Sequence, residues 1–137
     1  MELRIDRSVS GNIMIGLCHE SVIREKEFIN CYGIGNGAYL IGQNNREQTS
    51  VCFHHSMPFL NRKEIVGWNF AEGETVTVGV SFEGEYVYFR KENGQEFTMK
   101  VAGEEYKPEI GGLLQEGFKV LVLLQAEGDQ VTALRDD

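Results

Sequence analysis

The stretch CYGIGNGAYLIG, residues 31–42, is the part of the sequence that most directly suggests chemistry. Gly33, Gly35 and Ala38 fit the dinucleotide-binding pattern G-x-G-x-x-G/A, whose glycines let the backbone approach a pyrophosphate at the start of a helix. That chemistry needs a helix after the glycines. Here Ala38-Tyr39-Leu40-Ile41 is instead a short apolar and aromatic run, closed by turn-forming residues. The pattern therefore predicts a turn that enters a β-strand, not a phosphate site.

Cysteine and histidine side chains near the middle of the chain could in principle bind zinc. Cys52 and His54 lie on the same side of a predicted strand, and Cys18, His19 and His55 are further possible donors. However, no C-x-x-C or H-x-x-x-H spacing holds two ligands together locally, and cysteine is a common core residue. We expect structural, unligated thiols and no metal or cofactor. No G-x-S-x-G elbow exposes a nucleophile either, so the sequence does not predict an enzyme.

Length and charge restrict the possible partners. The 137 residues suit a single domain, residues 1–137, with one core. A net charge of -8 without any Lys/Arg cluster disfavours nucleic acid and anionic membranes as partners. The longest apolar stretch, residues 120–126, is too short to span a bilayer, and no secretion signal is visible. Together with three cysteines, an odd number, these features predict a cytoplasmic protein with reduced thiols.

The hydrophobic pattern has the period of a β-strand. Residues 75–82 alternate strictly, so one face of this strand should point into the core. A tight connection at Glu83–Glu85 and an Asn93-Gly94 signal for a two-residue turn then predict a three-stranded meander. The residues expected to point inward are Val76, Val78, Val80, Phe82 and Phe89.

Similar short runs on both sides of the meander predict further strands, eight or nine in all. They are ELRID, NIMIGLC, AYLI, SVCFHH, FKVLVLL and QVTALR, separated by turn-forming residues. Only His19–Asn30 has a helix-compatible spacing, over one or two turns. The fold class that follows is all-β: an antiparallel two-sheet β-sandwich with at most one short helix.

Several of these motifs resemble a SPRY domain, a bent, concanavalin-like β-sandwich of many eukaryotic ubiquitin-ligase and receptor proteins. Phe70 precedes Gly73-Glu74, Phe89 precedes Asn93-Gly94, and Tyr106-Lys107-Pro108 leads towards a last apolar strand at Phe118–Leu124. GAYLIGQNN and IMIGLC are similar to two further strands of that family. The resemblance covers roughly residues 12 to 125 and implies a protein-interaction module. Glu74 replaces the usual aspartate, and the missing N-terminal strands should leave the first sheet short or its edge open.

The segment His54–Asn69 is the longest predicted connection, and long ordered loops in compact domains are often functional. Its hydrophobic side chains either fold back on the core or form an anchor patch for a partner. The neighbouring turn at Gln43–Arg46 is polar, so its amides could bind a peptide backbone. The residues predicted to bind a protein partner are Phe59, Arg62, Trp68, Asn44 and Asn45.

The function predicted from these features is therefore binding of a peptide or a neighbouring protein subunit through strand-connecting loops. Two alternatives remain open at this point. One is an architectural subunit of a larger eukaryotic assembly. The other is a small all-β ligand-binding protein or enzyme that uses the histidine and cysteine side chains.

Overall fold

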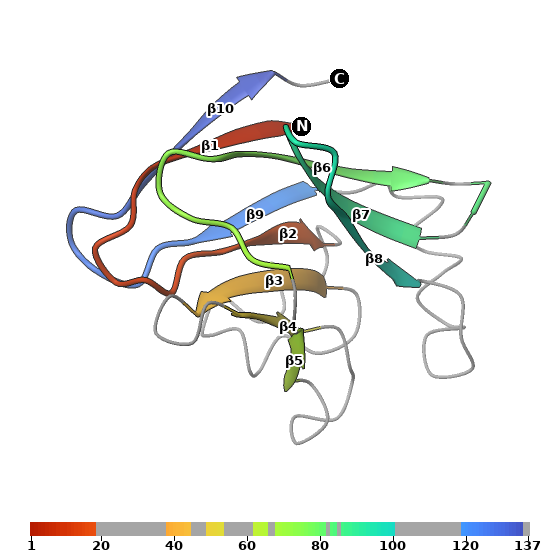
Figure 1. Cartoon of the computed structure of the whole chain (residues 1–137), viewed down its shortest axis with the longest axis horizontal. Coiled ribbons are helices and arrows are strands. Elements are labelled where there is room, and N and C mark those ends of the chain that lie inside the picture. The colour runs from red at the N-terminus through yellow and green to blue at the C-terminus, as the bar shows by residue number, and fades with distance from the viewer. Residues whose placement is uncertain are drawn as a thin grey trace.

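The chain forms two five-stranded antiparallel β-sheets (Figure 1). The structure is a computed structural model that describes residues 1–18, 38–44, 49–53, 62–65, 68–81, 83–84, 86–100 and 119–135. Every element in these ranges is a strand, and none of the described residues lies in a helix that could cross a membrane. The strands are β1 (Glu2–Arg7), β2 (Met14–Cys18), β3 (Ala38–Asn44), β4 (Thr49–Phe53), β5 (Arg62–Ile65), β6 (Thr75–Ser81), β7 (Tyr86–Lys91), β8 (Glu96–Lys100), β9 (Lys119–Leu123) and β10 (Gln130–Arg135).

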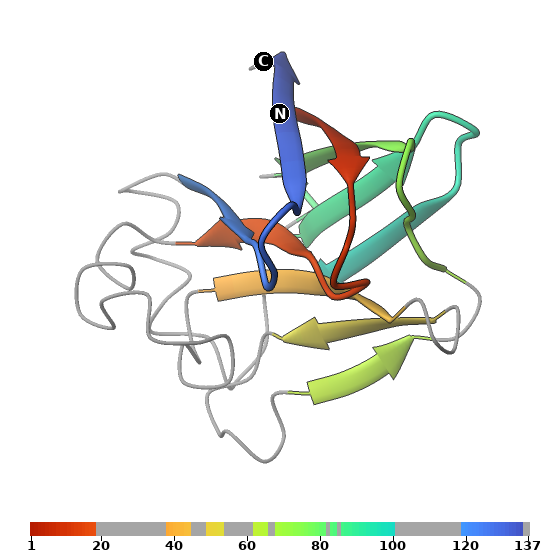
Figure 2. The ribbon, with the colours of Figure 1, turned by 90° about the vertical axis from the view of Figure 1, so that its left-hand side faces the viewer.

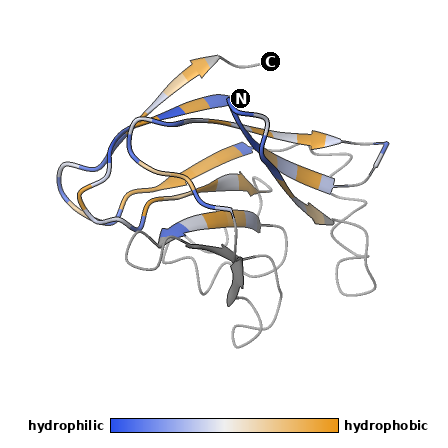
Figure 3. Ribbon diagram, in the orientation of Figure 1, coloured by the Kyte–Doolittle hydropathy of each residue, from blue (hydrophilic) through white to orange (hydrophobic). Residues whose placement is uncertain are grey.

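The two sheets pack face to face with the core between them (Figure 2). Sheet A has the strand order β10-β1-β6-β7-β8, and sheet B has the order β5-β4-β3-β2-β9. Hydrophobic residues lie mainly along the strands, whereas polar residues occur in the turns at both ends of the sandwich (Figure 3). The predicted fold class, an all-β two-sheet antiparallel sandwich, is confirmed.

The meander β6-β7-β8 forms as the alternating pattern predicts, with each strand antiparallel to the next. Val76, Val78 and Phe89 are at most 1% exposed, and Val80 packs partly buried against the same core. Phe82 lies outside the described residues. The period of two therefore correctly identifies the core face of sheet A.

Strand β2, which lies between β3 and β9 in sheet B, is buried on both faces. All five of its residues are buried, as expected for an apolar run without alternation. Gly16 is required here, because a Cβ at this position would lie 2.0 Å from the carbonyl oxygen of Tyr39 on β3. Strand β3 itself begins at Ala38, where the glycine-rich pattern ends. The prediction of a strand rather than a phosphate-binding helix is confirmed, although this strand continues to Asn44.

The Asn93-Gly94 turn contains three residues rather than the predicted two. The amide of Lys91 donates to the carbonyl of Gln95 (2.9 Å), so residues 92–94 form the loop. Gly94 has φ 89 and its amide donates to the carbonyl of Lys91 (3.0 Å). A turn followed by a left-handed glycine is the common three-residue hairpin, because its twist matches that of the strands.

Two further expectations need correction. The predicted loop His54–Asn69 is interrupted by β5, whose residues RKEI form the edge of sheet B. Because three of its four residues are charged, this strand shows no apolar alternation that would predict it. Charged side chains are nevertheless typical of an edge strand, since they discourage pairing with other chains. The expected open edge beside β1 is occupied by β10. The predicted helix at His19–Asn30 lies outside the described residues.

We predict that Val78→Asp prevents folding, because it places an unpaired charge in the centre of the core. Thr77→Asp is the matched control, since Thr77 is on the opposite face of β6 and partly exposed. Circular dichroism and thermal unfolding should show a β-sheet spectrum and a cooperative transition for Thr77→Asp only. A folded Val78→Asp variant would contradict the assignment of this face to the core.

Candidate interaction surface

Of the predicted partner-binding residues in sheet B, the structure describes the backbones of Asn44 and Arg62, which lie on different strands. Asn44 is the last residue of β3, and Arg62 is the first residue of β5. Arg62 of β5 pairs with Phe53 of β4, and Phe53 pairs with Leu40 of β3. Arg62 is therefore level with Leu40, which is four residues before Asn44 on the same strand. At about 3.3 Å per residue, the two are roughly 13 Å apart along the strand direction alone. Phe59 and Asn45 lie outside the described residues.

Trp68 belongs to the hydrophobic core. Its side chain is buried, with 6% of the residue exposed, and its ring contacts Phe70 and Phe97 at centroid distances of 6.1 and 6.4 Å. The ammonium group of Lys91 lies 5.6 Å from the ring centroid, close enough for a cation–π interaction. Of the two alternatives for the hydrophobic residues of this segment, Trp68 follows the first, folding back on the core. Little of its surface remains for a partner.

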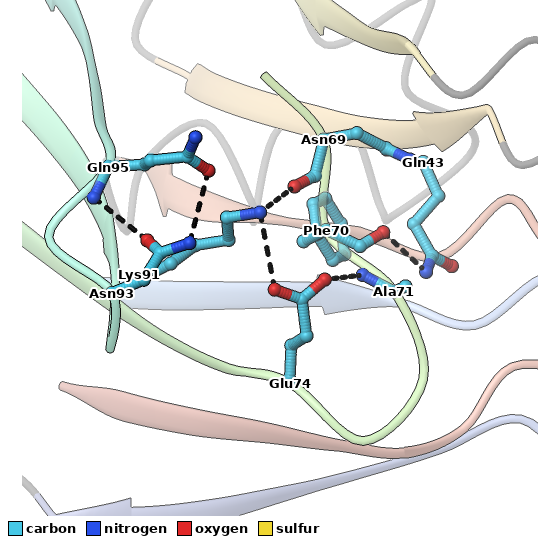
Figure 4. Close-up of polar contacts among 8 residues, drawn as sticks. All are labelled: Gln43, Asn69, Phe70, Ala71, Glu74, Lys91, Asn93 and Gln95. Atoms are coloured by element: carbon cyan, nitrogen blue, oxygen red, sulfur yellow. Dashed lines mark hydrogen bonds and ion pairs between the residues drawn. The ribbon is translucent and has the colours of Figure 1, made fainter. Parts of the chain in front are cut away.

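Lys91 attaches the segment Trp68–Glu74 to sheet A (Figure 4). Its ammonium group donates to the carbonyl of Asn69 (2.8 Å) and forms an ion pair with Glu74 (3.2 Å). The other carboxylate oxygen of Glu74 accepts a hydrogen bond from the amide of Ala71 (2.9 Å). This segment is therefore held in place by bonds from β7 and from within itself as it enters β6.

Gln43 has a different role from the one predicted for it. It lies in β3 and is 3% exposed, so it is not part of an open polar turn. Its side-chain nitrogen donates to the carbonyl of Phe70 (3.0 Å), as Figure 4 shows. Its side-chain oxygen accepts bonds from the hydroxyl of Ser8 (2.6 Å) and the amide of Ile13 (3.1 Å). Both the nitrogen and the oxygen of this amide bond other parts of the protein, and at 3% exposure the group is not accessible to a peptide.

Asp129 joins the β1–β2 connection to the β9–β10 turn. Its two carboxylate oxygens accept hydrogen bonds of 2.6 to 3.1 Å from five donors: the amides of Val9, Ser10, Gln125 and Ala126, and the hydroxyl of Ser10. Burial by itself would raise the pKa of this carboxyl. The hydrogen bonds outweigh that effect and lower the pKa to about 2. The conformation of both loops thus depends on the ionised carboxylate.

The described residues offer little for cysteine or metal chemistry. Cys18 is buried, its thiol lies 3.7 Å from the carbonyl oxygen of Lys119, and burial raises its pKa to about 12. A thiol with this pKa is a poor nucleophile and a poor metal ligand at neutral pH. Within the described ranges no three His, Cys, Asp or Glu side chains are grouped to hold a metal ion. Cys31 and all three histidines lie outside these ranges, and only the backbone of Cys52 is described.

Tyr86, Tyr88 and Arg90 form a continuous strip on the outer face of sheet A, which we call the tyrosine strip. These alternate residues of β7 point away from the core, since Val87 and Phe89 between them are fully buried. The two rings meet edge to face at a centroid distance of 6.5 Å, and the guanidinium of Arg90 lies 4.9 Å from the Tyr88 ring centroid. The sequence carries this signal as the Tyr-x-Tyr-x-Arg spacing of YVYFRK, although the alternation in this run predicts only which residues face the core.

Neighbouring groups hold the tyrosine strip in one arrangement. The Tyr88 ring crosses Gly79 of β6, where an added Cβ would lie 2.4 Å from the ring and hydroxyl atoms. Arg90 donates to Glu96 of β8 (2.7 Å) while its side chain remains 50% exposed. Tyr86 and Tyr88 are both partly exposed. The strip therefore combines accessible aromatic surface with a charged group whose position is already set.

Comparisons of the chain with protein-family models, with curated proteins and with solved structures find no match. The sandwich architecture is established by the strand order and pairing described above. Membership of the SPRY family stays a prediction from the sequence motifs.

We predict that Gln43→Met lowers the free energy of unfolding by about 2–4 kcal/mol. Methionine keeps the length of the side chain but leaves the Phe70 carbonyl and the Ile13 amide without their side-chain partner. Gln95→Met, at an exposed position, is the control and should change stability by less than about 0.5 kcal/mol. Urea unfolding measures both, and equal stabilities would contradict a structural role for the Gln43 amide.

We predict that Asp129 makes the protein sensitive to acid. The pKa of about 2 in the folded protein lies below the ordinary aspartate value of 3.8, so the stabilisation from Asp129 is present above about pH 4 and is lost as the pH falls towards 2. Asp129→Ala should lower the free energy of unfolding by about 3 kcal/mol at neutral pH, and by progressively less below about pH 4. Glu127→Ala, exposed in the same turn, is the control. A deficit that did not change with pH would contradict this assignment.

Proposed function

We propose that this chain is a protein-interaction module of the SPRY-like sandwich type, which binds a peptide or a neighbouring subunit. The observation that carries the proposal is the tyrosine strip on the outer face of sheet A. Tyrosine and arginine are enriched among the residues that dominate binding energy at protein interfaces. The strip presents both within one short strand.

The fixed geometry of the strip favours binding. Tyr88 rests on Gly79, and Arg90 is already oriented by Glu96. Side chains that are ordered before binding lose less conformational entropy when a partner covers them. A partner that stacks on Tyr88 would therefore use a surface that needs no rearrangement.

The charge of the chain favours a basic partner. A net charge of -8 attracts Lys- and Arg-rich surfaces and repels phosphate groups. Phe59, Arg62, Asn44 and Asn45 remain proposed contacts of the same function. Asn44 and Arg62 lie on β3 and β5 of sheet B, so their contribution is separable from that of the tyrosine strip on sheet A.

Affinity capture with matched variants tests the proposal. The tagged chain is incubated with a lysate of the cells that express it, and the recovered protein is then titrated against Tyr88→Ala, Phe59→Ala and Arg62→Ala. Val9→Ala is the control, because it removes a side chain that is 53% exposed in a different part of the molecule. Truncation of a true anchor should cost about 2 kcal/mol, which is roughly a thirtyfold loss of affinity.

The variants also separate the two regions. Loss with Tyr88→Ala alone would support the tyrosine strip, and loss with Phe59→Ala or Arg62→Ala would move the site to the loops. Each variant must first melt like the parent. If all of them bind as tightly as Val9→Ala, the captured protein does not use either surface and the proposal is wrong.

A further inference from the structure

Strand β10 forms an edge of sheet A with one neighbour, β1, among the described strands. Figure 2 shows β9 and β10 leaving a common turn and diverging, each along the edge of its own sheet. On the side away from β1, the amide and carbonyl groups of β10 have no strand partner in the described part of the chain. Such an edge is a template for one more strand.

The core beside this edge is incomplete. Leu3 and Ile5 of β1 are 2% and 0% exposed, and they pair directly with Ala133 and Val131 of β10. Directly opposed residues share a face of the sheet, so Ala133 and Val131 also point towards the core. Yet Ala133 is exposed and Val131 is only partly buried. Across the sandwich, the core-facing residues of β9, Val120 and Val122, are likewise only partly buried. One added strand with apolar side chains on its inner face would extend the core face of sheet A next to Val131 and Ala133.

The β10 edge carries fewer charged residues than two other edges, since Arg135 at its end is its one charge. Strand β5 carries three charged residues in the four of RKEI, and β8 begins with Glu96 and ends with Lys100. Charged side chains of this kind discourage edge-to-edge pairing. Residues 130–134 of β10, QVTAL, contain neither a charge nor a proline, and Leu134 is 44% exposed.

We propose that the β10 edge binds an extended segment of a partner protein as an additional antiparallel strand. The segment would carry apolar residues at alternate positions, facing Val131 and Ala133, and uncharged or basic residues between them, because the chain is acidic overall. A second copy of this chain fits less well. Six residues are far fewer than the roughly 20–30 that each partner contributes to a stable interface, whereas a peptide strand gains its affinity from main-chain hydrogen bonds. This edge is distinct from the tyrosine strip on β7, so either surface can fail its test without the other.

Nuclear magnetic resonance titration with two synthetic peptides tests the proposal. The first probe, acetyl-KVTVTVK-amide, presents valines on one face of a strand. The second, acetyl-KPTPTPK-amide, has the same charge but replaces the three valines by proline, which removes their backbone N–H groups and disfavours pairing as a strand. We expect saturable shifts and slowed amide hydrogen exchange at residues 130–135 with the valine peptide only.

Two protein variants complete the experiment. Ala133→Lys places a charge on the inner face of the edge and should weaken the valine peptide at least about tenfold. Thr98→Lys adds the same charge at an exposed position of β8 and should leave binding unchanged. Equal binding by the two variants, equal binding of the two peptides, or shifts confined to β9 would overturn the proposal. Slow exchange, without any peptide, of the β10 amides that point away from β1 would overturn it as well, because another part of the chain or a second copy would then already pair with this edge.

Discussion

The side-chain amide of Gln43 is buried next to the core, and the path of the chain around it is determined by the need to satisfy that amide. A buried polar group without partners costs more than most single contacts contribute, so its donors and acceptors must converge from elsewhere. Gln43 on β3 of sheet B bonds the β1–β2 connection through Ser8 and Ile13, and the segment leading into β6 of sheet A through Phe70. One side chain thereby joins three separate parts of the chain. Lys91 likewise joins the segment before β6 to sheet A, and Asp129 joins the β1–β2 connection to the β9–β10 turn.

These buried polar groups also decide which surfaces remain available. Gln43 and Trp68 were candidates for recognition because one is polar and the other aromatic. Both side chains are buried and contact other parts of the protein instead. Among the described residues, two accessible surfaces are on sheet A: the outward residues of β7, and the side of β10 away from β1 with its partly exposed core-facing residues. Both surfaces exist because a strand has two faces and two hydrogen-bonding edges. The core covers only one of the faces, and a strand at the border of a sheet pairs along only one of its edges. Recognition by a sheet face and a sheet edge is compatible with a rigid scaffold, since neither requires a loop to become ordered.

The fold was more predictable than the site. Alternation in β6 and β7 identified both the strands and their inward residues, because the pleat repeats every two residues regardless of what packs against it. The run NIMIGLC likewise indicated a strand, and the structure shows that all five residues of β2 are buried. Strand β5 was missed because RKEI has no hydrophobic period; its conformation depends on pairing with β4, a contact that local sequence does not encode. The position of β10 beside β1 was missed for the same reason, since more than a hundred residues separate the two strands in the sequence.

The sequence alone determined the class of the domain, the core face of the meander and the absence of a helix after the glycine-rich stretch, because these follow from periodicity, turn residues and backbone preferences that act over a few neighbours. It also carried the YxYxR spacing that puts three side chains on one face of a strand. Only the tertiary structure decided whether that face points to the core or away from it, that Trp68 is packed under Lys91, and that the Gln43 amide bonds the protein rather than a ligand. The physical reason is that burial and hydrogen bonding depend on which distant segments of the chain meet. A residue type determines which bonds its side chain can form, but not which partners the fold places beside it.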